Sequence, residues 1–591
     1  MSSPAPLGSE GGTLSEVLPS VLPSGLPTRW AIYPRIGESE RSQLHVDSLL
    51  LAQLLWNRGV RTQAQAASFL TPDQLDGLSD PFALRGMDVA VDRLLGALKG
   101  GESIAVYGDF DVDGIAGAAL VAEAIRLAGA TPTVYLPNRA REGHGLNVDA
   151  LQQLNDRGVR VIVTVDCGIT AGIEVARASE LGMDVIVTDH HTVPIELPGA
   201  LSVLNPHQDG CSYPFKDLAG GGVALQLARG LLSSCLAAGE ASQRSAELTD
   251  LAALSTVADM VPLVSENRAI VAHGLVGLRE GRRPGLNMLC KRAGRAVADL
   301  TARDLAFSMI PRLNAAGRMG DARDALDLLL STDLDSAQEL AERLEQANGA
   351  RRDQLSDFLS ALEGDVAEAE TDSAVVIDGP YPVGLAGLLA SRLVDRWQVP
   401  SVVIQRDGPL CRGSARAPEG YHLVQLLEEC SDRLIQFGGH ARAAGFTLEA
   451  RHIESFRTAF IAAARADRSA AAPERILAAD GRLQLQSVGP ALADLVARFE
   501  PTGEGNPPPT FVSRVSVLRI EDTSNGHLRM RLRDGTGIRK AVAFRPAFPS
   551  PAEGSQIEVL YEVSRRYRDD AQQIELVVRD VAQPGHLSST V

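Results

Sequence analysis

The sequence predicts an α/β protein with two lobes followed by a β-barrel, and three observations support this. Apolar strand-like segments alternate with helix-like segments from residue 103 to residue 206, which is typical of a parallel, doubly wound sheet. A second α/β pattern begins at Ser373, after a mainly helical stretch. Five strand-like segments separated by turns lie near the end of the chain, and that number suits a small barrel. We therefore expect the 591 residues to form several domains.

The apolar segments set the order of the elements. The first region contains the strands IAVYGDF, TVYLP, VIVTVD, VIVTDHH and LSVLNP, with helices near 114–127, 148–156 and 173–181. One long connecting helix fits 340–362, and the second region has the strands AVVIDGP and SVVIQRD around a helix at 385–396. The segment 464–473, rich in Ala, Arg and Ser, is a predicted linker. The predicted divisions are a flexible tail at 1–28, a helical region at 29–100, the first α/β domain at 101–338, the connecting helix at 339–363, the second α/β domain at 364–467 and the barrel at 468–591.

Composition narrows the class of protein. The net charge of −17 argues against a surface covered in basic residues for wrapping duplex DNA, so any nucleic-acid contact must be local. No apolar run approaches the roughly 20 residues that span a bilayer, and we expect a cytoplasmic protein. The 6 cysteines are scattered without CxxC spacing, which predicts reduced thiols.

Acidic and imidazole side chains follow three of the predicted strands. The first strand runs into GDFDVDG, the third into DCG and the fourth into DHH. Ligands of open parallel sheets bind beyond the carboxyl ends of the strands, where the loops converge. We therefore expect one site that contains Asp109, Asp111, Asp113, Asp166, Asp189, His190 and His191.

This set of side chains favours divalent-cation chemistry. Clustered carboxylates repel one another unless cations neutralise them, and oxygen ligands with one or two imidazoles suit Mn²⁺ or Mg²⁺ better than a structural zinc. Two such ions can activate a water and stabilise a leaving oxygen, so no protein nucleophile is required. A lone DxD is more often a turn or a helix cap. The three motifs in this order nevertheless predict a two-metal phosphoryl-transfer site.

The motifs resemble those of the DHH phosphoesterase superfamily, which is named for the sequence found here at residues 189–191. YGDFDVDG, VDCGIT and VTDHH are similar to its first three motifs, and ADMVPL at 258–263 is similar to the fourth. The resemblance implies a role for His191 at the scissile phosphate and supporting roles for Asp109 and Asp189. It also implies that two Mn²⁺ or Mg²⁺ ions bind at the catalytic site and that Asp166 bridges them. The metal ligands that it implies are Asp111, Asp113, Asp166, His190 and Asp259.

One position departs from part of the superfamily. Some members carry a histidine ligand four residues before the first metal aspartate, where this chain has Tyr107. The departure implies that one metal binds firmly only together with substrate.

Further segments resemble the RecJ-like exonucleases within this superfamily, so that the resemblance extends from about residue 43 to 582. PRLNAAGRM, RGSARAP and FGGHARAAGF are similar to motifs of their catalytic and DHHA1 domains, and FEPTGEGNPPPTF followed by barrel strands is similar to their OB-fold. The resemblance implies nucleic-acid contacts at Arg312, Asn314, Arg318, Ser414, Arg416 and His440. The barrel has further candidate DNA contacts: Arg529, Arg531, Arg533, Arg539, Lys540, Phe544, Arg565, Arg566, Tyr567 and Arg568. The basic residues among them either contact DNA or form a solvated strand face, and Phe544 is more typical of a core residue.

The resemblance implies an exonuclease with DHH, DHHA1 and OB-fold domains. It would degrade single-stranded DNA 5′ to 3′, release 5′ mononucleotides and act in DNA repair and recombination. Two alternatives remain: a phosphoesterase for short oligoribonucleotides or cyclic dinucleotides, which generally lacks a trailing barrel, and a catalytically silent DNA-binding scaffold, which has typically lost metal ligands. The sequence identifies no helicase or single-strand-binding protein as a partner, and we expect no room for a further domain after the barrel.

Overall fold

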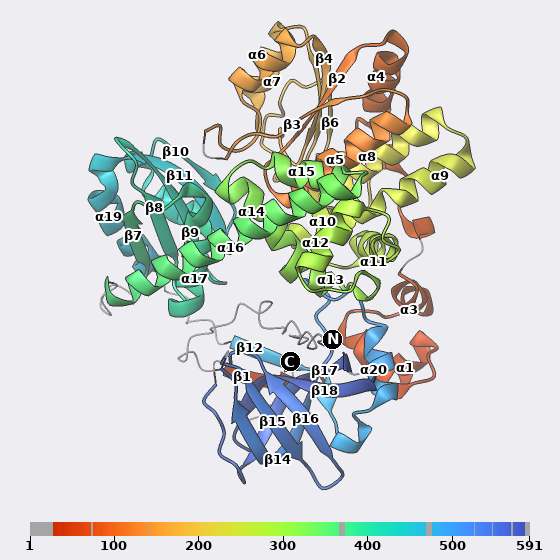
Figure 1. The fold of residues 1–591 in the computed structure, drawn as a ribbon, viewed down its shortest axis with the longest axis vertical. Coiled ribbons are helices and arrows are strands. Elements are labelled where there is room, and N and C mark those ends of the chain that lie inside the picture. The colour runs from red at the N-terminus through yellow and green to blue at the C-terminus, as the bar shows by residue number, and fades with distance from the viewer. Residues whose placement is uncertain are drawn as a thin grey trace, which may run out of the picture.

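Three bodies follow one another in the computed structural model, a larger α/β domain, a smaller α/β domain and a barrel (Figure 1). The structure describes residues 28–72, 75–139, 141–365, 373–467, 475–524, 526–546, 548–568 and 571–585. The predicted tail at 1–28, apart from Thr28, and the linker residues 468–473 lie outside these ranges. No helix in the described part of the chain has both the length and the apolar character needed to cross a membrane.

A five-stranded, all-parallel sheet forms the centre of the first body, which confirms the predicted doubly wound sheet. Its order is β3-β2-β4-β5-β6, with bounds Thr133–Tyr135, Ser103–Gly108, Val159–Val165, Asp184–Thr188 and Ser202–Leu204. Both faces are covered: Ile104 and Val106 of β2 lie in one apolar core, and Ala105 and Tyr107 lie in another. The helices on the two faces (Figure 1) are α4 (Met87–Gly100), α5 (Val112–Leu127) and α8 (Gly220–Cys235), opposite α6 (Val148–Asp156) and α7 (Gly172–Glu180).

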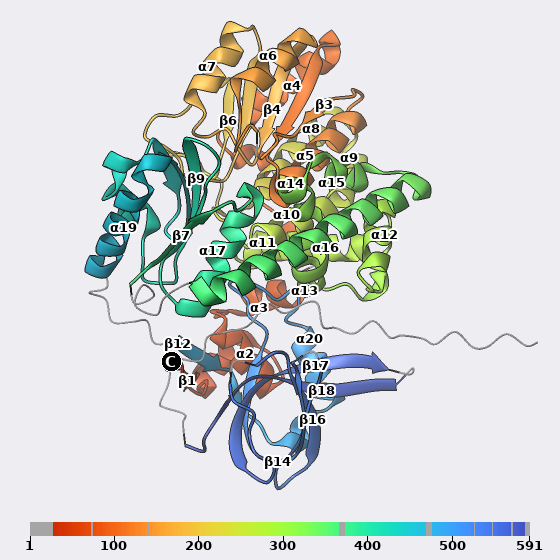
Figure 2. The ribbon, with the colours of Figure 1, turned by 60° about the vertical axis from the view of Figure 1, so that its left-hand side comes forward.

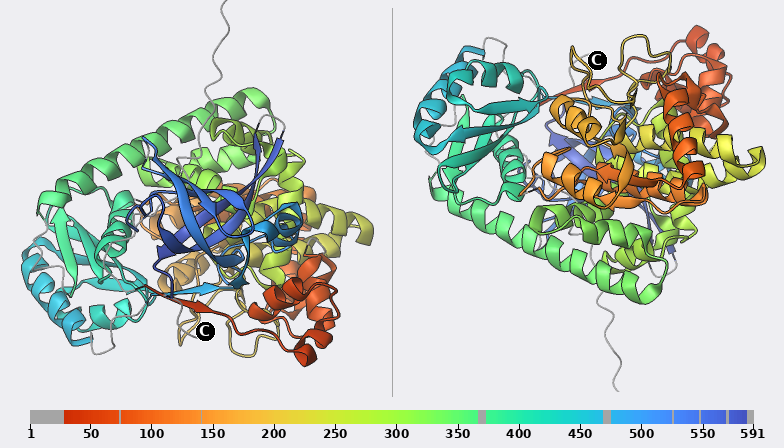
Figure 3. Two further views of the ribbon diagram at one scale, coloured as in Figure 1. Left: turned by 90° about the horizontal axis from the view of Figure 1, so that it is seen from below. Right: turned by 90° about the horizontal axis from the view of Figure 1, so that it is seen from above.

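Helices continue the first body and then lead to the second. The connecting helix α16 (Leu334–Asp365) has 32 residues and runs along one side of the molecule (Figure 3). It starts before the predicted residue 339 because Asp333 caps it, with Ser336 N donating to Asp333 Oδ1 at 2.8 Å. The remaining helices are α9 (Ala238–Glu247), α10 (Thr249–Ala258), α11 (Ser265–Arg279), α12 (Pro284–Arg292), α13 (Ala302–Asp304), a π-helical turn at Leu305–Met309, α14 (Ile310–Met319) and α15 (Arg323–Leu330).

The second body is a mixed sheet with helices. Strands β7 (Val375–Gly379) and β8 (Ser401–Gln405) are parallel, as the alternating pattern predicted, whereas the remaining strand pairs are antiparallel. The order is β10-β11-β9-β8-β7, and Figure 2 shows α17 beside it. The other elements are β9 (Leu410–Arg416), β10 (Gln436–Gly439), β11 (Ala443–Glu449), α17 (Val383–Trp397), α18 (Leu423–Glu428) and α19 (Ile453–Asp467).

The third body is a closed five-stranded barrel, which confirms the predicted OB-type barrel. Closure comes from β14, which pairs with β15 on one side and with β17 on the other. Two of its strands are 13 residues long, so they are not the short strands the sequence suggested. The barrel strands are β14 (Thr510–Asp522), β15 (Leu528–Arg533), β16 (Ile538–Ala543), β17 (Gln556–Arg568) and β18 (Ala571–Ala582), preceded by β13 (Gly481–Arg482) and α20 (Pro490–Ala497).

The N-terminal region differs from the helical unit predicted at 29–100. Strand β1 (Thr28–Ile32) pairs in parallel with β12 (Arg475–Ala479), which directly precedes the barrel in the sequence. Helix α4 belongs to the first body, while the three helices before it share an apolar core with the barrel. Those three helices are α1 (Glu38–Leu44), α2 (Leu49–Asn57) and α3 (Gln63–Leu70). The N-terminal region is therefore divided between two bodies.

Candidate metal centre

Three adjacent strands of the parallel sheet end in acidic residues. The ladder continues past the strand ends, because Asp109 N donates to Val165 O at 3.3 Å, Asp166 N to Thr188 O at 3.0 Å and Asp189 N to Leu204 O at 3.0 Å. Each acid is thus held at the same edge by main-chain bonds to the neighbouring strand. Asp166 has a φ of 61°, an unfavourable conformation for a residue with a Cβ, which redirects the chain at the end of β4.

Asp111 and Asp113 lie at the start of α5. Asp111 caps this helix, since its Oδ1 accepts from Asp113 N at 3.1 Å and from Gly114 N at 3.3 Å. The turn is tight: a Cβ on Gly114 would lie 2.4 Å from Asp109 N. Asp113 is buried and is fixed from α8 and α10, because it accepts from Gly220 N, Gly221 N and Ser255 Oγ. Two carboxylates are therefore rigidly oriented by neighbouring backbone.

His190 lies among the acids from all the other elements. Its Nε2 is 3.2 Å from Asp166 Oδ1 and 3.6 Å from Asp113 Oδ2, and its Nδ1 is 3.6 Å from Asp259 Oδ2. Asp259 is the C-cap of α10, and it joins this group although it is far away in sequence. The structure thus brings together all of the expected ligands. Three overlapping sets have ligand atoms within 4.8 Å of one another: Asp113, His190 and Asp259; Asp166, His190 and His191; and Asp109, Asp111 and Asp166.

Asp109 and Asp189 differ in their surroundings. Asp189 accepts from Ile169 N, His190 N and His191 N, and from His191 Nδ1 at 2.7 Å, so it holds the DHH turn in place. Asp109 Oδ1 is buried with no hydrogen-bond partner in the described part of the chain, which leaves it free to accept a cation or a water. The geometry therefore allows Asp109 more than the supporting role inferred from the sequence.

The acids are electrostatically unsatisfied. Burial and the nearby carboxylates raise the pKa of Asp111 and of Asp166, and burial together with Asp113 and Asp111 raises the pKa of Asp259 to about 8. Burial lowers the pKa of His191, but its bond to Asp189 and the charges of Asp189 and Asp259 outweigh this and raise it to about 9. Buried oxygen donors that repel one another fit a divalent-cation set.

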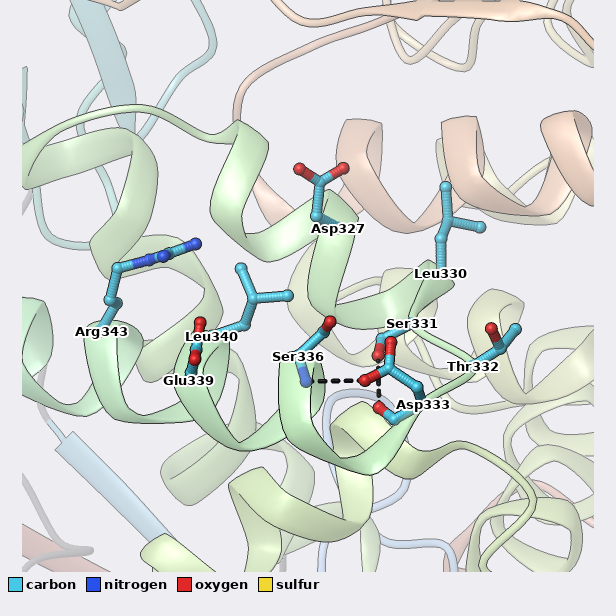
Figure 4. Close-up of a pocket in the computed structure, with 9 residues that line it drawn as sticks. All are labelled: Asp327, Leu330, Ser331, Thr332, Asp333, Ser336, Glu339, Leu340 and Arg343. Atoms are coloured by element: carbon cyan, nitrogen blue, oxygen red, sulfur yellow. Dashed lines mark hydrogen bonds between the residues drawn. The ribbon is translucent and has the colours of Figure 1, made fainter.

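A cavity of about 740 Å³ opens at this group of residues. His191 in its wall stacks on His440 from the second body, with ring centroids 5.9 Å apart and planes 15° apart. The apolar side chains of Val193, Pro194, Ile195 and Leu197 also line the cavity, and Ile195 is fully exposed. A second hollow, drawn in Figure 4, surrounds the cap of α16, where Ser331 and Ser336 bond to Asp333; its polar groups serve the helix start.

Two half-buried arginines lie close to the acidic group, Arg318 near Asp111 and Arg416 near Arg139. Arg318 of α14 donates to Gly384 O at 3.1 Å, and Arg416 of β9 bonds to Ser414 Oγ at 3.3 Å. A Cβ on Gly387 would lie 2.8 Å from a terminal nitrogen of Arg416, so glycine makes room for that side chain. Burial, with repulsion from Arg139, lowers the pKa of Arg416 and lowers that of Arg318 to about 9.

Two arginine-motif residues have different positions from those expected. Arg312 is 4% exposed and pairs with Glu345 at 2.5 Å, while it also donates to Ser308 O at 2.8 Å. Asn314 Oδ1 accepts from Val112 N at 3.1 Å. These side chains join α14 to α16 and to the start of α5, so the Arg312 guanidinium and the Asn314 carbonyl oxygen are used within the domain.

Several residues at the site lie outside the sequence motifs and were not predicted. Arg139 follows β3, lies 4.1 Å above the ring of Phe110, and has a buried Nε without a partner in the described part of the chain. His144 Nδ1 is 2.9 Å from Asp109 Oδ2, and Ser255 bonds to Asp113. A basic residue and a histidine in the RAREGHG segment were the available clue, but their approach to the acids depends on the fold.

The barrel residues divide into exposed and engaged ones. Arg529, Arg531 and Arg533 alternate with buried residues on one exposed face of β15. Arg539 donates to Val488 O at 2.7 Å, and Arg565 pairs with Asp494. Other candidates also have partners: Lys540 contacts Gln573 at 3.5 Å, and the half-buried Phe544 packs against His527. The side chains of Arg566, Tyr567 and Arg568 lie outside the described residues.

Comparison with known proteins assigns all three bodies. The model of the DHH family, N-terminal domain, matches residues 103–256, that of the DHHA1 domain matches 375–466, and that of the RecJ OB domain matches 479–580. The single-stranded-DNA-specific exonuclease RecJ of Bacillus subtilis is 35% identical over 94% of this chain and 71% of its own length. RecJ of Escherichia coli is 34% identical over 81% of this chain and 86% of its own. The crystal structure of Thermus thermophilus RecJ in complex with Mn²⁺ matches with a TM-score of 0.81, at 28% identity, over 95% of this chain and 80% of that one.

Proposed function

Because this chain belongs to the RecJ family of DHH phosphoesterases, we propose that it is a metal-dependent exonuclease that removes 5′ mononucleotides from single-stranded DNA in the 5′ to 3′ direction. One observation carries the proposal. Carboxylates and imidazoles from the ends of β2, β4 and β5, the start of α5 and the end of α10 form three overlapping sets of potential ligands, and the half-buried Arg318 of α14 and Arg416 of β9 lie near them. Solved relatives hold Mn²⁺ or Mg²⁺.

The residues that would hold two Mn²⁺ or Mg²⁺ ions in this proposal are Asp111, Asp113, Asp166, His190 and Asp259. Asp166 would be shared, because its carboxylate has two oxygens and belongs to two of the three sets. When bound, such ions neutralise the carboxylates, activate a water and stabilise charge on the phosphate. The histidines have distinct tasks. Asp189 accepts a hydrogen bond from the ring of His191 and fixes its orientation, so His191 can donate to the phosphate or the leaving oxygen.

The arginines support the proposed direction of degradation. A 5′-terminal phosphate is a dianion at neutral pH with three acceptor oxygens, while a 3′ end offers a neutral hydroxyl. Arg139, Arg318 and Arg416 are half-buried. Arg139 and Arg318 lie near Asp111, and Arg139 repels both Arg318 and Arg416, so a terminal phosphate would relieve this repulsion. Ser414 and His440 border the same space and complete the proposed grip. A phosphate held there leaves the next phosphodiester at the metal centre.

The barrel supports a polymeric substrate. OB-folds bind single strands along a basic groove, and the exposed arginines of β15 supply such charge here. This favours long single strands over short oligoribonucleotides or cyclic dinucleotides, and the complete acidic set disfavours a silent scaffold. Roles in DNA repair and recombination, in the cytoplasm, belong to the same proposal; a helicase or a single-strand-binding protein is the kind of partner it would work with.

End-labelled DNA tests the proposal. Single strands and duplexes, labelled at either end, are incubated with Mn²⁺, Mg²⁺ or chelator. We expect a 5′ label on single strands to appear at once as mononucleotide, a 3′ label to shorten gradually, and chelator to stop both. Early release of the 3′ label, or equal degradation of blunt duplexes, would contradict the assignment.

A further inference from the structure

The segment between α10 and α11 connects Asp259 to the interior of the protein through an unfavourable backbone. It has only a few residues, and two non-glycine residues at its ends have positive φ: 60° at Met260, its second residue after α10, and 46° at Ser265, the first residue of α11. Such conformations persist only where surrounding structure imposes them. Since Asp259 immediately precedes Met260, whatever holds this segment also determines where the Asp259 carboxylate lies.

A loop from the barrel side makes the holding contacts. This loop, residues 499–506, contains the motif FEPTGEGN and is called the 499–506 loop below. Leu263 N donates to Glu504 O at 2.7 Å. A Cβ on Gly503 would lie 2.8 Å from Leu263 Cδ1, and one on Gly505 would lie 2.9 Å from Pro262 Cβ. The loop therefore presses on the segment at three consecutive contacts, three to four residues beyond Asp259.

The 499–506 loop is itself rigid. Asn506 Nδ2 donates to Phe499 O at 2.9 Å and to Pro501 O at 2.8 Å, and the main chains of Gly503 and Asn506 bond to each other in both directions. From the other side Arg58 Nε donates to Asn506 Oδ1 at 3.1 Å. Few alternative conformations remain, so the loop can transmit position to what it touches.

The first turn of α11 is attached to the same loop. Arg268 is 3% exposed, and its guanidinium donates to Phe499 O at 3.0 Å, Pro501 O at 2.9 Å and Glu500 O at 2.9 Å. Its neighbour Asn267 donates to Pro262 O at 3.1 Å. The 260–265 segment is thus tied to the loop in its middle, at Pro262 and Leu263, and at its C-terminal end through α11.

We propose that the 499–506 loop positions Asp259 at the metal centre through residues 260–265, so that the attachment of the barrel sets how tightly Asp259 holds its cation. The inference rests on the proposed role of Asp259 as a ligand. Groups that orient metal ligands typically change metal affinity by roughly 10- to 100-fold when they are altered. The loop is accordingly a positioning element. It affects metal affinity, whereas the DNA-binding face of the barrel affects affinity for single strands.

The test is Mn²⁺ binding to the full chain, measured without DNA from the electron paramagnetic resonance signal of free Mn²⁺. Gly505→Ala places a methyl group against Pro262 at a φ of +68°. Gly554→Ala is the matched control, because it has a similar φ of +82° in the same body but nothing within 4 Å of the added methyl. We expect G505A to weaken Mn²⁺ binding roughly tenfold and G554A to leave it unchanged, with equal single-strand affinity of both proteins in chelator.

Asp259→Asn is measured alongside to separate the two claims. If D259N weakens Mn²⁺ binding and a folded G505A does not, the positioning role is wrong and the ligand assignment stands. If D259N also binds Mn²⁺ as the unchanged protein does, the ligand assignment and this inference both fail. Should G505A unfold, Gly503→Ala replaces it with the same two outcomes, since it presses on Leu263 without a positive φ.

Discussion

The strand ends of the DHH sheet and the facing surface of the DHHA1 sheet are opposites in charge, but both are incompletely satisfied. On the DHH side, burial and mutual repulsion raise the pKa of Asp111 and Asp166. On the DHHA1 side, burial and neighbouring guanidiniums lower the pKa of Arg416. Joining the two surfaces directly would have neutralised both. Their separation leaves one side to attract cations and the other to attract phosphate, and this difference makes the two sides separately testable.

Removing charge from the acidic side should have the largest effect. Asp166→Asn keeps the shape of the side chain but removes a carboxylate shared by two ligand sets, so the rate of 5′-label release should fall at least about a hundredfold. The midpoint of thermal unfolding, measured in chelator, should not fall, because the substitution removes a negative charge that neighbouring carboxylates repel. Asp156→Asn, at the exposed end of α6, is the control. An unchanged rate for D166N would remove the acidic side from the mechanism.

Removing charge from the basic side should instead weaken recognition of the 5′-terminal phosphate of the DNA. Arg416→Ala should raise KM for 5′-phosphorylated single strands roughly 10- to 100-fold, as expected for one charge-assisted hydrogen bond. Strands with a 5′ hydroxyl should be affected much less. Arg451→Ala changes an exposed arginine of the same domain that pairs with Glu449. Equal losses on both kinds of DNA end would show that Arg416 does not recognise the terminal phosphate.

The acidic side should also make metal binding depend on pH. With its pKa raised to about 8, Asp259 is protonated at neutral pH when no cation is bound. Mn²⁺ must displace that proton, so its affinity should rise with pH and level off above about 8, by up to about tenfold per pH unit for each proton displaced. Calorimetric titration in buffers of different ionisation enthalpy measures both affinity and proton release. Affinity that is flat from pH 6 to 8 would contradict the raised pKa.

The barrel should contribute the smallest effect for a single residue. Arg531→Gln on the exposed face of β15 should weaken binding of long single strands a few-fold and lower the slope of log affinity against log salt by about one. Short oligonucleotides that reach only the metal centre should be cut as before. Fluorescence anisotropy across a salt series gives both quantities, and Arg514→Gln on β14, also exposed, serves for comparison. An unchanged slope would mean that β15 does not lie on the DNA path.

The acidic side could be predicted from the sequence because it is encoded locally. Each acid directly follows a Val- and Ile-rich strand, and parallel strands bring their carboxyl ends to one edge. Asp259 had no such local signal, and only the family resemblance indicated it. The order of the three bodies was predictable for similar reasons, since strand and helix periodicity change from one to the next.

What could not be predicted depends on contacts between distant residues. Strand β1 pairs with β12 across more than four hundred residues, so a five-residue strand next to the tail gave no usable pattern. Arg312 was expected to bind phosphate, but a carboxylate of α16, Glu345, occupies its guanidinium. Arg139 and His144 reach the acids from a loop whose path is set by tertiary packing.

Anomalous diffraction from crystals grown with Mn²⁺ tests the central claim most directly. We predict two manganese peaks within coordination distance, about 2.0–2.3 Å, of carboxylates or imidazole from Asp111, Asp113, Asp166, His190 and Asp259. Both manganese peaks should lie within this distance of the Asp166 carboxylate. Peaks located elsewhere, with these side chains still packed against one another and free of metal, would contradict the account.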